Sequence, residues 1–124
     1  MSAQKVRRLS KICAALAAKL NSTEYALAAA VRDLAEAERV FSGLCAEHAV
    51  KPEMDDPAFA AFTERRRALI RERLAALQST IAMLIEKKEM RRREVESVLR
   101  QKIAVESARD ALMVERKREL ARRA

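Results

Sequence analysis

The sequence predicts an all-α protein: a long antiparallel two-helix coiled coil, or helical hairpin, whose second helix is longer than the first. Two features of the composition favour long helices. The 124 residues include 25 alanines, one glycine, two prolines and no tryptophan, and 35% of them are charged. One strong break then divides the helical pattern, and apolar residues on either side of it recur at the three- and four-residue spacing of a coiled coil.

The first helix is predicted over about residues 3–48. Twelve of its positions follow an unbroken 4-3-4-3 spacing, which is expected of a helix that lies along another helix. We call these positions the first seam: Leu9, Cys13, Leu16, Leu20, Thr23, Leu27, Ala30, Leu34, Ala37, Phe41, Leu44 and His48. Gly43 lies inside this helix and should cost about 1 kcal/mol relative to alanine.

Residues 49–56 are predicted to be a loop. Pro52 cannot continue a helix and moves Lys51 out of the helical region. Asp56 is suited to be an N-cap, and Pro57 fits the first helical position because its missing N–H has no partner there. A short connection between two amphipathic helices predicts an antiparallel hairpin. The whole chain, 1–124, is therefore expected to be a single coiled-coil hairpin.

The second helix is predicted over about residues 57–122, with a less regular pattern. Ile70, Leu74, Leu77, Ile81 and Leu84 keep the heptad spacing. Two other runs are spaced by four, which locally unwinds a supercoil: Phe62, Arg66, Ile70 and Leu74, and Val95, Leu99 and Ile103. Between Ile85 and Val95 the chain is strongly charged, and Met90 or the alkyl stems of Lys88 and Arg91 are expected to cover the first helix.

The register of the hairpin follows from where the chain folds back. If it does so within residues 49–56, His48 lies opposite about residue 58. The second helix would then extend past the first from Ala104 onwards, as a basic overhang. Six apolar residues of the two helices lie beside the seam of the hairpin, and they either widen the packed face or form a second stripe for a partner: Ile12, Val31, Val40, Leu69, Met83 and Ile85.

The net charge of +8 is concentrated in the second half of the chain and suits an acidic partner, nucleic acid or an anionic membrane. Each basic run, 65–67, 91–93 and 116–118, is flanked by glutamate, and no aromatic residues alternate with it for base stacking. This pattern argues against nucleic acid. No signal peptide or spanning apolar segment is evident, so the protein is expected to be cytoplasmic and peripheral to a membrane at most.

The side chains that carry chemistry do not form a recognisable active site. Cys13 and Cys45 would lie about 48 Å apart on one helix, so they cannot form a disulfide with each other. Cys13 is expected to be a small buried residue, and His48, the single histidine, is expected to cap the hairpin end. No zinc-binding spacing and no phosphate-binding loop occur. We therefore expect no enzyme, no catalytic residue, no metal and no cofactor.

A local resemblance appears at residues 56–62, Asp-Pro-Ala-Phe-Ala-Ala-Phe, and at the N-terminal segment 5–9, Lys-Val-Arg-Arg-Leu. Together with weak heptads and a basic balance, these segments resemble the FliJ-like family of flagellar export and type III secretion stalk proteins. The resemblance implies a cytosolic, non-enzymatic stalk that inserts into the ring of the export ATPase. It also implies contacts with the cytoplasmic domain of the export gate and with export chaperones.

In this family the gate contact uses a stripe on the second helix just past the loop, at positions i, i+4, i+7 and i+11. The resemblance therefore implies a partner-binding stripe of Phe62, Arg66, Leu69 and Arg73, and Phe59 is assigned to partner binding with it. The two arginines depart from the apolar character of the stripe. The alternative interpretation is a nucleic-acid-associated or self-assembling structural coiled coil. The sequence leaves open whether the chain is a monomeric hairpin or a homodimer.

Overall fold

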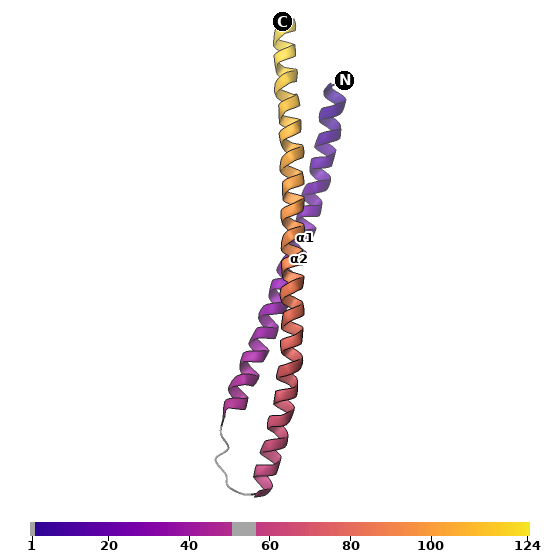
Figure 1. Ribbon diagram of the computed structural model, residues 1–124. Coiled ribbons are helices and arrows are strands. Elements are labelled where there is room, and N and C mark those ends of the chain that lie inside the picture. The colour runs from indigo at the N-terminus through magenta and orange to yellow at the C-terminus, as the bar shows by residue number, and fades with distance from the viewer. Residues whose placement is uncertain (1, 51–56) are drawn as a thin grey trace. The chain divides into compact units, whose positions relative to one another are not determined.

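The structure is a computed structural model that describes residues 2–50 and 57–124 (Figure 1). Helix α1 spans Ser2–Ala49 and helix α2 spans Pro57–Arg123, with 48 and 67 residues, and the described residues contain no strand. The predicted all-α hairpin with a longer second helix is confirmed, and both helices lie within one residue of their expected bounds. The expected N-cap, Asp56, and most of the expected loop lie outside the described residues.

The chain divides into two units, each built from a stretch of α1 and a stretch of α2. Unit 1 contains residues 1–27 and 90–124, and unit 2 contains residues 28–89. In unit 1 the helices are antiparallel, because Thr23 lies near Glu94 while Val6 lies near Met113 and Leu120. In unit 2 the end of α1 lies beside the early turns of α2.

The first seam is the packed face of α1 in both units. All twelve of its positions are buried or half-buried, as the heptad spacing predicts. The most buried are Cys13 in unit 1 and Ala30 and Leu34 in unit 2, with exposed fractions of 6%, 1% and 7%. Both cysteines are free thiols, and Cys45 is exposed. The expectation that Cys13 is a small buried residue is therefore confirmed.

The packed face of α2 follows one heptad spacing in each unit, and we call it the second seam. All its positions are buried or half-buried: Thr63, Arg67, Ile70, Leu74, Leu77, Ile81 and Leu84 in unit 2, and Arg91, Val95, Val98, Lys102, Val105, Arg109 and Leu112 in unit 1. Lys88, which the same spacing also includes, is exposed.

The two predicted runs of four on α2 are wrong. Phe62 and Arg66 are exposed, as are Leu99 and Ile103, at 42% and 55%. Basic side chains occupy the heptad positions instead, and their alkyl stems can cover apolar neighbours while the charged ends reach solvent. Arg91 is half-buried in this way, whereas Met90 is 58% exposed and does not belong to the second seam.

The register of the hairpin also differs from the prediction. In unit 2, the Nη2 of Arg67 donates a hydrogen bond to the carbonyl oxygen of His48 at 3.1 Å. His48 thus lies beside Arg67 rather than residue 58, because residues 57–62 are all exposed and packing begins at Thr63. In unit 1, Val6 shares a hollow with Met113 and Leu120. The overhang predicted from Ala104 is therefore wrong, since α2 still packs against α1 well beyond that residue.

Most of the six apolar residues expected beside the seam of the hairpin remain at the surface. Val40 alone among the six named above is half-buried and widens the packed face. The other five have exposed fractions between 41% and 71%: Ile12, Val31, Leu69, Met83 and Ile85. These five side chains do not pack fully against the facing helix, so their exposed surface is in contact with solvent or is available to a partner.

Gly43 lies within α1 without a positive φ, and a methyl group added there would meet no atom within 4 Å. Gly43→Ala is therefore expected to raise the free energy of unfolding by about 0.5–1 kcal/mol, because alanine favours the helix and restricts the unfolded chain. Urea unfolding followed by circular dichroism measures the change. A lower stability of the alanine variant would show that the position requires glycine.

Candidate partner-docking surface

The first turns of α2 expose two aromatic side chains next to the end of α1. Phe59 and Phe62 are 52% and 63% exposed, and Val50, just after α1, is 68% exposed. The N–H of Val50 donates to the carbonyl oxygen of Glu47 at 3.3 Å, which continues the last turn of α1. We call Val50, Phe59, Phe62 and Arg66 the aromatic patch.

The aromatic patch surrounds a hollow of about 330 Å³ in unit 2. Its lining combines the patch with Glu47 from α1 and with Thr63, Arg67 and Ile70 from α2. A second hollow of about 300 Å³ is formed by Ala58, Phe59 and Phe62 alone. Both phenylalanine rings thus border open space on more than one side. A surface of this kind can accept an apolar side chain of another protein.

Two arginines beside the hollow have different surroundings. Arg66 forms an ion pair with Glu47, and both side chains are largely exposed. Such a pair contributes little to stability but fixes the position of the guanidinium group. Arg67 is half-buried and donates to His48 through Nη2, while its Nε is buried without a hydrogen-bond partner among the described residues. The hollow is therefore lined by two guanidinium groups and one carboxylate, that of Glu47.

The structure brings together three of the five residues assigned to partner binding. Phe59, Phe62 and Arg66 line one hollow. Leu69 and Arg73 are also exposed and continue from Arg66 along α2, but they do not line it. Sequence reasoning missed Val50, Glu47 and Arg67. Extending the heptad of Ile70 backwards by three and by seven residues would have found Arg67 and Thr63.

The candidate chemical groups remain separate. Nε2 of His48 is buried without a hydrogen-bond partner among the described residues, and no hydrogen bond joins His48 to Cys45. Within residues 2–50 and 57–124, no three His, Cys, Asp or Glu side chains are grouped so that they could hold a metal ion. Glu36 and Arg39 form a largely exposed ion pair on α1. The hydrogen bond from Arg39 and then its charge lower the pKa of Glu36.

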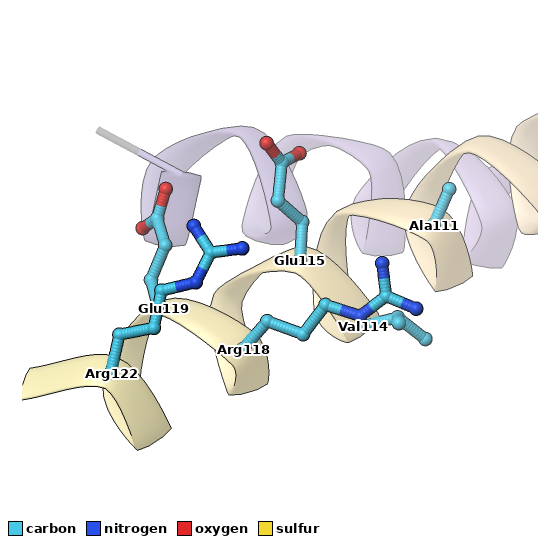
Figure 2. A pocket seen from close by; sticks show the side chains of 6 residues that line it. All are labelled: Ala111, Val114, Glu115, Arg118, Glu119 and Arg122. Atoms are coloured by element: carbon cyan, nitrogen blue, oxygen red, sulfur yellow. The ribbon is translucent and has the colours of Figure 1, made fainter. Parts of the chain in front are cut away.

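Unit 1 carries hollows of a different kind. Figure 2 shows the one on α2, where all six lining side chains project from the same helix: Ala111, Val114, Glu115, Arg118, Glu119 and Arg122. A hollow with walls from a single helix is a depression between side chains and encloses no ligand. A smaller one of about 220 Å³ lies between the helices, at Val6, Met113, Arg116, Lys117 and Leu120.

Neither of the two helices, over the part of the chain that the structure describes, contains a segment long and apolar enough to cross a bilayer. Comparison of the chain with known protein families, with curated proteins and with solved structures gave no match.

Proposed function

We propose that this chain is a non-enzymatic, cytoplasmic stalk or adaptor of a bacterial flagellar or type III protein export apparatus. In this proposal it docks on the export ATPase ring and on the cytoplasmic domain of the export gate, and it also contacts export chaperones. The proposal is supported by the resemblance at residues 56–62 and by a helical hairpin of the expected kind.

The observation that carries the proposal is the exposure of Phe59 and Phe62 in the first turns of α2. The exposed apolar surface of a large aromatic side chain is unfavourable in water, so its burial against a partner is favourable. Burial of each ring would contribute roughly 1.5–3 kcal/mol to binding. Leu69 and Arg73, further along the same helix, extend the surface that a partner could cover.

The test is a binding measurement with purified export ATPase and purified gate domain. Phe62→Ala combined with Leu69→Glu is expected to weaken binding at least about tenfold, because it removes two apolar contacts and adds a carboxylate. Both side chains are exposed, so circular dichroism should stay helical. Isothermal titration calorimetry or a quantitative pull-down gives the affinity.

The matched control changes two exposed apolar residues elsewhere. Ile85→Ala combined with Ile103→Glu removes side chains of 51% and 55% exposure outside the aromatic patch. Its affinity should equal that of the unchanged protein. The proposal fails if the unchanged chain binds neither partner. Equal losses in both variants would instead count against the assignment of binding to Phe62 and Leu69.

A further inference from the structure

One end of unit 1 holds almost all of the net charge of the chain. We call residues 3–11 of α1 and 112–123 of α2 the basic end. It carries nine basic and two acidic side chains, a net charge of +7 out of +8 for the chain. The two segments lie together, because Val6 from α1 and Met113, Arg116, Lys117 and Leu120 from α2 border one hollow.

The basic side chains of this end have no carboxylate partners. None of the nine forms a hydrogen bond or ion pair among the described residues: Lys5, Arg7, Arg8, Lys11, Arg116, Lys117, Arg118, Arg122 and Arg123. Figure 2 shows Arg118 and Arg122 extending from α2 near Glu115 and Glu119, and no ion pair joins them.

The preceding part of α2 in the same unit is different. Arg91 pairs with Glu94 at 3.1 Å, Lys102 with Glu106 at 3.6 Å and Arg109 with Asp110 at 3.3 Å. In residues 90–110 of α2, four carboxylates partly offset six basic side chains and leave a net charge of +2. In the basic end, two carboxylates accompany nine basic side chains. Nine unpaired cations in a small region create a strong positive potential that attracts polyanions.

Exposed apolar side chains lie among these charges. Met113, Val114 and Leu120 are 43%, 50% and 57% exposed, and Met113 and Leu120 border the hollow together with Arg116 and Lys117. Nucleic acid would match the charges but offer nothing to these apolar groups. The basic end also contains no aromatic residue for base stacking. A bilayer surface with anionic headgroups suits both features of the basic end. Its phosphates can pair with the cations, and its headgroup–acyl boundary can bury the apolar side chains.

We propose that the basic end docks on a bilayer surface rich in anionic phospholipid, with Met113 and Leu120 entering the headgroup–acyl boundary and Arg116 and Lys117 contacting lipid phosphates. This peripheral attachment does not depend on the aromatic patch, which lies in unit 2. It goes beyond the proposed function because it adds a lipid partner to a chain otherwise expected to bind proteins.

The test is sedimentation of the full chain with vesicles of phosphatidylcholine alone or of phosphatidylcholine mixed with phosphatidylglycerol. Binding is expected to the anionic vesicles, with a steep loss as salt is raised. Near an anionic surface each Lys or Arg contributes about fivefold to the binding constant, so Arg116→Gln with Lys117→Gln should weaken binding about 25-fold. Leu120→Asn, which keeps every charge, should weaken it about tenfold.

The matched control is Lys87→Gln with Lys88→Gln, which removes two exposed cations from unit 2 and should leave vesicle binding unchanged. Circular dichroism confirms that each variant stays helical. The proposal is overturned by an absence of binding to anionic vesicles at low salt, by equal binding to the neutral vesicles, or by an equal loss in the control. Binding to duplex DNA without binding to vesicles would also overturn it.

Discussion

Ile70→Ala is expected to lower the free energy of unfolding by about 2–4 kcal/mol. Ile70 is 7% exposed and lies on the second seam, where it packs against α1 in unit 2. Few side chains share this task, since six residues in the described chain are apolar and buried: Cys13, Leu20, Ala30, Leu34, Ile70 and Val98. Small proteins have a free energy of unfolding of only about 5–15 kcal/mol, so the loss of one of these six buried side chains is a large change.

The neighbouring residue supplies a matched control. Leu69 is 61% exposed, so Leu69→Ala is expected to change the free energy of unfolding by less than about 0.5 kcal/mol. Both substitutions introduce alanine into the same turn of α2, so differences in helix propensity are small compared with the expected gap. Urea unfolding followed by circular dichroism at 222 nm measures both. Equal destabilisation by the two variants would contradict the packed face assigned to α2.

The central line of the packed face of α1, the first seam, could be predicted from the sequence, whereas its widening by Val40 could not. Its twelve positions combine small and large apolar residues with one threonine and one histidine, and nothing polar and long interrupts the spacing. The end of α1 and the start of α2 could also be predicted, because Pro52 and Pro57 restrict the backbone directly. Heptad spacing and the backbone restrictions of proline were therefore sufficient to predict these features.

The packed face of α2 could be predicted only in its centre. Outside Ile70 to Leu84 the heptad positions include Arg67, Arg91 and Lys102, which a search for apolar residues passes over. A long basic side chain can occupy such a position because its stem is apolar. Lys102 does so, while Leu99, three residues before it, is 42% exposed. The register error has a different origin, because His48 was paired with about residue 58 on the assumption that packing begins directly after the loop. In the structure residues 57–62 are exposed and packing begins at Thr63.

The candidate site was predicted in part. Phe59, Phe62 and Arg66 were named from a resemblance at residues 56–62, and all three prove to be exposed around one hollow. The contribution of α1 to this hollow, Glu47 and Val50, depended on the register and was therefore missed. A surface built from two helices can be predicted from sequence only when their pairing is known.

Val98→Asn is expected to lower the stability of unit 1 by about 2–4 kcal/mol, whereas Leu99→Asn should cost about 1 kcal/mol or less. Val98 is 4% exposed and Leu99 is 42% exposed. Asparagine at residue 98 would bury a polar amide in place of two methyl groups. Aspartate is a poorer choice because Lys19 lines the hollow beside Val98 and would offer its charge to a carboxylate.

This pair of variants separates two alternatives for α2. If the packed face ran through Val95, Leu99 and Ile103, Leu99→Asn would be the damaging change and Val98→Asn the mild one. Hydrogen exchange of the amides in residues 90–112 is the suitable measurement, because it reports opening of unit 1 even where unit 2 stays folded. Faster exchange is expected in the Val98 variant alone, because the packing of α2 against α1 in unit 1 is stabilised by Val98 and by the alkyl stems of the basic seam residues near it.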